Sequence, residues 1–424
     1  MAASAPVTLN RPAADPAGGP APRYTSALSA VTTLFFLWGF ITCLNDILIP
    51  YLKAIFQLSY AQANLINLCF FGAYFLMSIP AGKVVARVGY KRGMLLGFVV
   101  AAVGAFLFYP AASARAYGLF LGALFVLASG ITLLQVAANP YVAILGPAAS
   151  ASARLTLTQA FNSLGTTLAP LLGSALILSQ LPALNTATSA AAIDVRAVQL
   201  PYLVIGGILL LISLMLSRVT LPTITFAAEA ETAGPERGAW QYRHLALGVV
   251  GIFAYVGAEV AIGSHIVSYL ALPSVMGLGP MEAGTKVSYY WGAAMIGRFA
   301  GAYLLNKFSP AKLLAVNGVG AVVLILISIN TTGAVAMWSL LAVGLMNSLM
   351  YPTIFALALQ GLGRRTEEGS GLLCTAIVGG ALVPLLFGFI ADHSSLRLAL
   401  LLPIVCYVYI MWYGLRGSRP AVPA

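Results

Sequence analysis

The feature of this 424-residue chain that most limits its possible folds is the near-absence of charge from its long apolar runs. Charged residues make up 8% of the chain and hydrophobic residues 60%, whereas a soluble domain carries roughly 25% charged residues. So little charge could not cover a water-soluble fold. Because a membrane-spanning helix needs about 20 apolar residues, the chain has room for roughly a dozen spans.

Apolar runs bounded by turn residues predict where these spans lie. The expected helices cover about 27–52, 61–86, 92–110, 116–143, 154–179 and 200–220, then about 244–271, 285–306, 311–330, 333–359, 367–391 and 396–415. We therefore predict an all-α membrane protein with twelve transmembrane helices.

A polar stretch in the middle of the chain divides these helices into two sets of six. The predicted order is a disordered cytoplasmic tail at 1–24, an N-terminal six-helix bundle at 25–220, a cytoplasmic linker at 221–243, a C-terminal six-helix bundle at 244–416 and a cytoplasmic tail at 417–424.

Short matches between the two sets recur at nearly one spacing. Ala169–Leu172 matches Val383–Leu386 at an offset of 214 residues, Pro140–Ala143 matches Pro352–Phe355 at 212, and Ala81–Gly82 matches Ala300–Gly301 at 219. Three matches in the same order indicate an internal duplication. Parallel six-helix repeats with a site between them are typical of the major facilitator fold.

The cations are unevenly divided between the two sides of the predicted membrane. With the N-terminus inside, the cytoplasmic segments hold Arg11, Arg23, Lys83, Arg87, Lys91, Arg92, Arg154, Arg218, Arg237, Arg243, Lys307, Lys312, Arg364, Arg365, Arg416 and Arg419. The other side holds Lys53, Arg115, Arg196, Lys286 and Arg397. This asymmetry satisfies the positive-inside rule, so both termini are expected in the cytoplasm. It explains the net charge of +11 without a nucleic-acid partner.

Three charged residues, Asp46, Glu259 and Arg298, fall inside predicted helices. A charge in the bilayer costs on the order of 3 kcal/mol or more, so these side chains should face the bundle interior. Asp46 shares a helix face with Thr42, and burial would favour its neutral form, so that it could load and release a proton. The alternative is a structural carboxylate near Pro50.

Glu259 lies one repeat offset from position 45, beside Asp46, so the two acids could face each other across a central cavity. Its open roles are coupling, substrate binding or a structural ion pair with Arg298. For Arg298, whose long stem could reach the cytoplasmic interface, a structural or gating pair is the favoured role and direct contact with the ligand is the alternative.

Neutral polar side chains in the spans suit a polyol, because they donate and accept hydrogen bonds without a buried charge. Gln135 with Asn139, Gln159 with Asn162, and Asn347 with Tyr351 are such pairs. Each could instead hold helices together. Trp38 could pack against a sugar ring, although core packing is the alternative. No spacing typical of a metal site, cofactor site or enzyme active site is present, so none of these is expected.

Several strings resemble the fucose:proton symporter family of the major facilitator superfamily, most closely its glucose/galactose permease branch. They are Phe36–Gly39, Leu44–Pro50, Gln135–Val142, Gln159–Asn162, Tyr255–Glu259, Gly297–Phe299 and Tyr351–Phe355. The resemblance covers about 30–415. It implies that Asp46 takes part in proton coupling and that Gln135, Gln159 and Tyr351 line a sugar cavity.

The chain departs from this family's pattern at two places. The loop at 82–92 is similar to the superfamily's gating motif, but Ala86 replaces the usual acid before Arg87. Lys83, Arg87 and Arg92 of this loop are assigned structural or gating roles. Fucose-type members carry a glutamate where this chain has Gln135, and an amide where it has Glu259. This exchange favours the hexose branch.

We therefore expect a bacterial inner-membrane importer of a neutral hexose, driven by symport with a proton or sodium and acting as a monomer in the lipid bilayer. Coupling is assigned to Asp46 and Glu259. The expected sugar-binding residues are Trp38, Thr42, Asn45, Gln135, Asn139, Gln159, Asn162, Tyr255, Glu259, Asn347 and Tyr351. The alternatives are a carrier of another sugar, such as N-acetylglucosamine or fucose, an exporter of a metabolite or drug, and a sensor built on the same fold.

Overall fold

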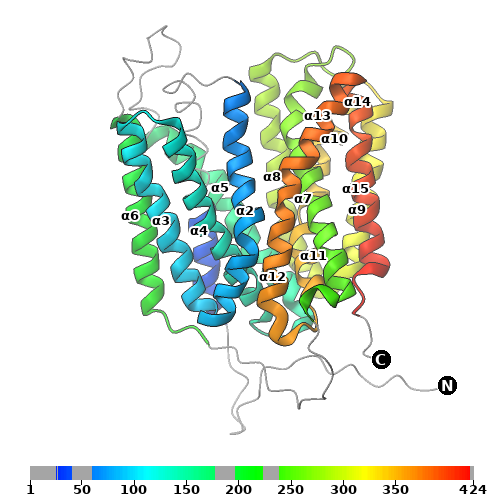
Figure 1. The fold of residues 1–424 in the computed structure, drawn as a ribbon. Helices are drawn as coiled ribbons and strands as arrows, with labels where there is room; N and C mark the ends of the chain where they lie inside the picture. The colour runs from blue at the N-terminus through cyan, green and yellow to red at the C-terminus, as the bar shows by residue number, and fades with distance from the viewer. Residues whose placement is uncertain (1–24, 26, 41–59, 177–195, 223–237, 421–424) are drawn as a thin grey trace, which may run out of the picture.

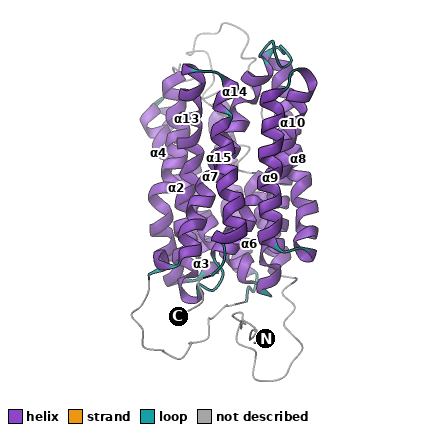
Figure 2. Ribbon diagram, turned by 90° about the vertical axis from the view of Figure 1, so that its right-hand side faces the viewer, coloured by secondary structure: helices purple, strands orange, loops and turns teal. Residues whose placement is uncertain are grey.

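The computed structural model describes residues 25, 27–40, 60–176, 196–222 and 238–420, and within these ranges every regular element is helical (Figure 2). The first group of helices comprises Ala27–Phe40, α2 (Tyr60–Val88), α3 (Tyr90–Ser113), α4 (Tyr117–Ile144), α5 (Ala151–Leu176) and α6 (Arg196–Arg218). We call these helices the N half.

The second group, which we call the C half, begins with three uninterrupted helices and ends with three interrupted ones. The uninterrupted helices are α7 (Arg243–Leu270), α8 (Pro280–Lys307) and α9 (Pro310–Asn330). The interrupted ones are α10 (Gly333–Asn347) with α11 (Met350–Ala358), α12 (Thr366–Thr375) with α13 (Gly379–His393), and α14 (Leu396–Ala399) with α15 (Leu401–Trp412). The prediction of an all-helical protein with twelve helical segments is confirmed.

The interruptions were not predicted, since 333–359 and 367–391 were expected as continuous helices. The chain leaves the helix at Ser348 and Leu349. Pro352, four residues after Ser348, has no N–H to offer the Ser348 carbonyl, so the helical bond there cannot form. A short 3₁₀ turn at Ala376–Val378 separates α12 from α13.

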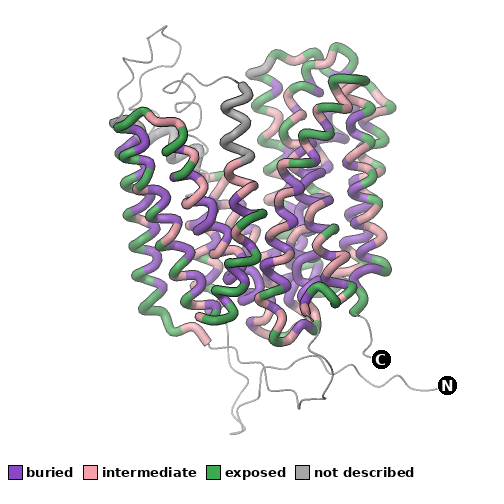
Figure 3. Tube along the Cα trace, viewed as in Figure 1, coloured by how far each residue is buried: buried purple, intermediate pink, exposed green. Residues whose placement is uncertain are grey.

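The outer surface of the bundle is suited to lipid. Nine helical segments in the described ranges are long and apolar enough to cross a membrane. Large apolar side chains such as Leu76, Ile296 and Leu385 are about 60% exposed on helix faces, and Figure 3 shows exposed residues on the outside of both halves. Because helices satisfy their own backbone hydrogen bonds, such faces can contact acyl chains.

The two halves stand side by side in Figure 1 and touch along two seams. One seam joins α2 and α4 to α12, and the other joins α5 to α8 and α11. In the first seam a Cβ on Gly82 would lie 2.9 Å from the Glu367 carbonyl oxygen, and one on Gly371 would lie 2.8 Å from that of Ser78. Glycine is therefore required for this close approach.

One end of the bundle carries most of the described cations. The helix ends and loops there hold Lys83, Arg87, Lys91, Arg92, Arg154, Arg218, Arg243, Lys307, Lys312, Arg364, Arg365, Arg416 and Arg419, and the other end holds Arg115, Lys286 and Arg397. We call the first the cation-rich end; it is the lower end in Figure 1. The Gly82–Gly371 contact lies toward it, because α2 ends and α12 begins there.

Candidate functional site

A cavity of about 190 Å³, lined by polar and apolar side chains, lies between the two halves. The N half contributes lining residues from Ala27–Phe40, α4 and α5, and the C half contributes them from α7, α8, α11 and the 3₁₀ turn after α12. The lining residues are Trp38, Gln135, Gln159, Asn162, Tyr255, Val256, Glu259, Arg298, Tyr351, Pro352 and Ile377. A cavity at this position can contact a ligand from both halves at once.

The N-half wall presents three amides whose orientations are fixed by neighbours. Gln135 donates from Nε2 to the hydroxyl of Tyr74 on α2. Asn162 donates from Nδ2 to the carbonyl oxygen of Phe35, 2.8 Å away. Gln159 donates from Nε2 to Oδ1 of Asn139 over 3.4 Å. An amide with its N–H₂ held in this way presents its carbonyl oxygen in a defined direction.

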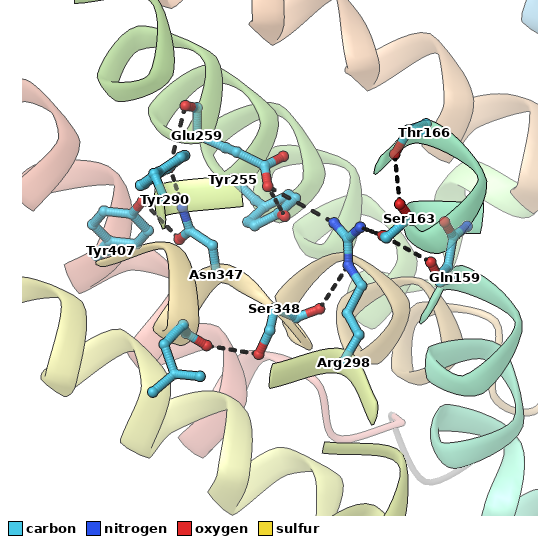
Figure 4. A network of polar contacts seen from close by, with 11 residues as sticks. Gln159, Ser163, Thr166, Tyr255, Glu259, Tyr290, Arg298, Asn347, Ser348 and Tyr407 are labelled. Carbon is cyan, nitrogen blue, oxygen red and sulfur yellow. Dashed lines mark hydrogen bonds and ion pairs between the residues drawn. The ribbon is translucent and has the colours of Figure 1, made fainter. Parts of the chain in front are cut away.

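The C-half wall carries a carboxyl group, from Glu259, and a guanidinium group, from Arg298 (Figure 4). The Tyr255 hydroxyl donates to Oε1 of Glu259 over 2.7 Å, and Nη2 of Arg298 lies 3.9 Å from the same oxygen. The side chains of Arg298 and Glu259 keep 17% and 12% of their surface exposed. The two groups are close enough for their charges to balance, but the distance between Nη2 and Oε1 is too long for a direct hydrogen bond.

Two serines hold the guanidinium of Arg298 in the cavity. Its Nε donates to the carbonyl oxygen of Ser348 over 3.2 Å, and its Nη1 donates to Oγ of Ser163 on α5. Since Ser163 belongs to the N half, Arg298 both lines the cavity and makes a hydrogen bond from the C half to the N half.

A second polar layer lies behind Glu259 and belongs entirely to the C half. The Tyr290 hydroxyl donates to the carbonyl oxygen of Glu259 over 3.3 Å. Asn347 donates to the Tyr290 hydroxyl over 2.7 Å and accepts from the Tyr407 hydroxyl over 2.8 Å. Asn347 is fully buried, so its observed bonds support the wall of the cavity and do not face its interior.

The repeat-related prolines Pro140 and Pro352 free one carbonyl each in the helices that line the cavity. Proline has no N–H, so the carbonyl four residues earlier loses its helical donor. For Pro140 this is the Val136 carbonyl, which accepts from Oγ of Ser370 over 3.0 Å. For Pro352 it is the Ser348 carbonyl, which accepts from Arg298. Both carbonyls are therefore satisfied by side chains from other helices.

The structure brings together most of the residues that the sequence singled out. Trp38, Gln135, Gln159, Asn162, Tyr255, Glu259 and Tyr351 all line the cavity. Arg298, expected to have a structural or gating role, lines it too. Asn139 and Asn347 are buried behind the lining. Asp46, Thr42 and Asn45 lie outside the described residues.

The loop cations predicted to gate lie elsewhere. Lys83, Arg87 and Arg92 are exposed at the cation-rich end, away from the cavity lining. The sequence did not single out the lining residues Val256, Pro352 and Ile377, nor the supporting residues Tyr74, Ser163 and Ser348. The spacing of Ser163 from Gln159, four residues on the same helix face, was a usable signal. No cluster of three or more His, Cys, Asp or Glu side chains occurs among the described residues.

Twelve helical segments in the described ranges, arranged as two halves around a shared cavity, are the architecture of a membrane transporter. The chain belongs to the Major Facilitator Superfamily, whose family model matches residues 30–377. It is therefore a transporter and not an enzyme, and the family predicted from its strings is confirmed.

Two relatives and one solved structure are similar over nearly the whole chain. The "Glucose/galactose transporter" of Brucella abortus biovar 1 (strain 9-941) is 55% identical over 397 residues, which are 94% of this chain and 95% of that protein. The "L-fucose-proton symporter" of Escherichia coli (strain K12) is 35% identical over 432 residues, covering 96% and 97%. The crystal structure of the transporter FucP in the outward conformation has a TM-score of 0.87 and 34% identity, covering 93% and 99%.

Proposed function

We propose that this protein imports a neutral hexose of the glucose or galactose type by symport with a cation, and that a proton is the coupling ion. The observation that carries the proposal is the cavity lining, which combines three amides, two tyrosines and one charge-balanced acid–base pair. The name of the Brucella relative supports the substrate class, and that of the Escherichia relative supports proton coupling.

The separation of Glu259 and Arg298 suits a sugar hydroxyl. A hydroxyl between the two groups would donate to the carboxylate and accept from the guanidinium. Both contacts are charge-assisted and therefore stronger than neutral ones. Because Nη2 and Oε1 are 3.9 Å apart, a hydroxyl oxygen to one side of the pair would be within hydrogen-bond distance of both atoms. We assign Arg298 a ligand role in addition to the structural role predicted for it.

The amides of the opposite wall would contact the remaining hydroxyls. Gln135, Gln159 and Asn162 each carry a carbonyl oxygen that accepts from a hydroxyl. The indole of Trp38 offers an apolar surface to the C–H face of a pyranose ring. Together these groups complement an uncharged polyol better than they complement an anion or a cation, because the lining carries no unbalanced charge.

We assign coupling to Asp46 and Glu259, as the sequence suggests. A protonated Glu259 would no longer balance the charge of Arg298, so proton binding there would alter the contacts of Arg298 with both halves. For Asp46, which lies outside the described residues, the assignment rests on the family resemblance.

The proposed topology places the cation-rich end in the cytoplasm of a bacterium, with both termini inside and the protein in the inner membrane. The two six-helix bundles at 25–220 and 244–416, joined by a linker at 221–243, are the proposed units that move against each other. We propose that the transporting unit is a monomer.

An uptake panel in proteoliposomes tests the proposal. Labelled glucose, galactose, mannose, N-acetylglucosamine and fucose are offered separately under an imposed pH gradient and under an imposed sodium gradient. We expect glucose or galactose to accumulate against its gradient when protons are supplied. Accumulation with a sodium gradient alone would show that the coupling ion is sodium and not a proton. Accumulation of a sugar other than glucose or galactose would show that the substrate is that sugar. No accumulation of any sugar would overturn the proposal.

A further inference from the structure

Asn139 and Tyr351 occupy equivalent positions in the two repeats and bond to each other. Each directly neighbours its repeat proline, Asn139 before Pro140 and Tyr351 before Pro352, and the offset between them is 212 residues. Nδ2 of Asn139 donates to the Tyr351 hydroxyl over 3.2 Å. Because α4 belongs to the N half and α11 to the C half, this bond crosses from one half to the other between equivalent positions.

A second bond from the same face of α4 also crosses to the C half. Val136 lies three residues before Asn139, so both are on one helix face. The Val136 carbonyl, which has no helical donor because of Pro140, accepts from Ser370 on α12. The turn that ends at Pro140 thus makes two polar contacts with the opposite half, one with α11 and one with α12.

Asn139 also holds a lining residue of its own half. Its Oδ1 accepts from Nε2 of Gln159, while the Asn139 side chain is fully buried. One amide therefore sets the direction of Gln159 on the N-half wall and of Tyr351 on the C-half wall. Sequence reasoning assigned Asn139 to the sugar itself, but its two amide atoms are occupied by these partners.

We infer that Asn139 is a positioning residue: its bond to Tyr351, the Asn139–Tyr351 tie, aligns the two cavity walls for the sugar and keeps the seam between α4, α11 and α12 closed. The inference rests on the proposed function for its sugar readout. The bond of 3.2 Å from Nδ2 of Asn139 to the Tyr351 hydroxyl is at the long end of the normal range, which suits a contact that is broken and remade in each transport cycle.

Sugar affinity gives the first test. Asn139→Ala should raise the KM for glucose or galactose about three- to tenfold, as expected for the loss of one hydrogen bond, with a smaller change in kcat. In a Tyr351→Phe background the same substitution should have a smaller effect on KM, because the tie is already absent and only the bond between Asn139 and Gln159 remains to be lost. If the fold-change in KM of the double variant equals the product of the fold-changes of the two single variants, the two residues act independently and the inference is wrong.

The native thiol of Cys374 on α12 gives a second readout that needs no sugar. Cys374 is fully buried, and the helix that carries it, α12, packs against α2 and α4 of the N half. With Cys43, Cys69 and Cys406 replaced by Ser, a water-soluble maleimide reports how often the seam beside Cys374 opens.

We expect Asn139→Ala and Tyr351→Phe each to raise the labelling rate of Cys374 several-fold. The matched control is Asn317→Ala on α9, which also removes a buried amide bond, from Nδ2 to the Met346 carbonyl, but outside the cavity lining. Labelling of both tie variants at the rate of this control would overturn the inference. If the unmodified protein moves no hexose, the proposed function fails while the labelling comparison still decides the tie.

Discussion

The two walls of the cavity differ in chemistry although they come from related repeats. In the described residues, the N-half wall contributes neutral amides at Gln135, Gln159 and Asn162, whereas the C-half wall contributes the charges of Glu259 and Arg298. A neutral wall can recognise hydroxyls without responding to pH or to ions. A wall with a titratable acid next to a fixed cation can change its contacts when a proton binds, so the carboxylate among the described lining residues that can respond to a proton belongs to the C-half wall.

The two proline turns show how one motif serves both walls. The carbonyl freed by Pro140 accepts from Ser370 of the opposite half, so this turn joins the halves. The carbonyl freed by Pro352 accepts from Arg298 of its own half, so this turn places a charge in the cavity. The same loss of one backbone N–H serves an interface in one repeat and holds a cavity-lining cation in the other.

The largest predicted effect comes from breaking the charge balance of the C-half wall. Arg298→Leu leaves the Glu259 carboxylate uncompensated, and removing one partner of a buried pair costs about 3–5 kcal/mol. We expect a lower yield of folded protein by size-exclusion chromatography and loss of uptake.

Adding Glu259→Gln to Arg298→Leu should restore folding, because the isolated charge is gone. It should not restore uptake, because both charged side chains that would contact the sugar are gone. If Arg298→Leu alone has normal yield and normal uptake, the charge balance between Glu259 and Arg298 is not needed for folding or for transport.

The next effect concerns the two proposed coupling acids. Asp46→Asn should abolish uphill accumulation while leaving sugar counterflow, since exchange needs no net proton movement. Glu259→Gln should do the same if it shares coupling, and should also raise KM if it binds the sugar. Both variants are measured in proteoliposomes with and without a pH gradient; full accumulation by Asp46→Asn would remove that residue from the coupling path.

Moving the acid across the cavity gives an intermediate effect. Gln135→Glu combined with Glu259→Gln transfers the carboxylate to the N-half wall, as in the fucose-type pattern. We expect glucose uptake to fall about tenfold and the preference to shift toward fucose, since a site built to pair a particular hydroxyl discriminates strongly against a mismatch. Unchanged preference in a competition assay would mean that the position of the acid does not set specificity.

The smallest predicted effect is on the neutral wall. Tyr74→Phe removes the hydroxyl that orients Gln135 and should raise KM about three- to tenfold, the value for one lost hydrogen bond, with kcat nearly unchanged. Tyr269→Phe is the matched control, because its buried hydroxyl donates to the Ser328 carbonyl outside the cavity lining. Equal KM values for the two variants would contradict the positioning of Gln135 by Tyr74.

The fold was largely predictable because a membrane span is a local property. Apolar length alone placed α4 and α9 to within one residue of their observed ends. The interruptions at Ser348 and at Ala376–Val378 were missed, although Pro352 was a signal for the first. Membrane spans are predicted from the length of an apolar run and not from backbone hydrogen bonds. A local break in a helix therefore does not change the predicted span.

The site was predictable only in part. Glu259 and Arg298 lie in the interior, as predicted for charges in apolar runs, and seven of the expected sugar ligands line the cavity. Which interior residues face the cavity depends on helix rotation and on partners far along the chain. Asn139 is occupied by Tyr351, 212 residues away, and Asn347 by Tyr290 and Tyr407. Such pairings are set by tertiary packing.

The central claim, that the cavity between the halves binds a hexose, is tested most directly by equilibrium binding to the purified protein. Calorimetric titration with glucose and galactose should show saturable binding. We expect Gln159→Leu to weaken it about tenfold, within the range for a polar group left unpaired, and Asn317→Ala to leave it unchanged. No saturable binding by the unmodified protein, or equal affinity in Gln159→Leu and the unmodified protein, would contradict the claim.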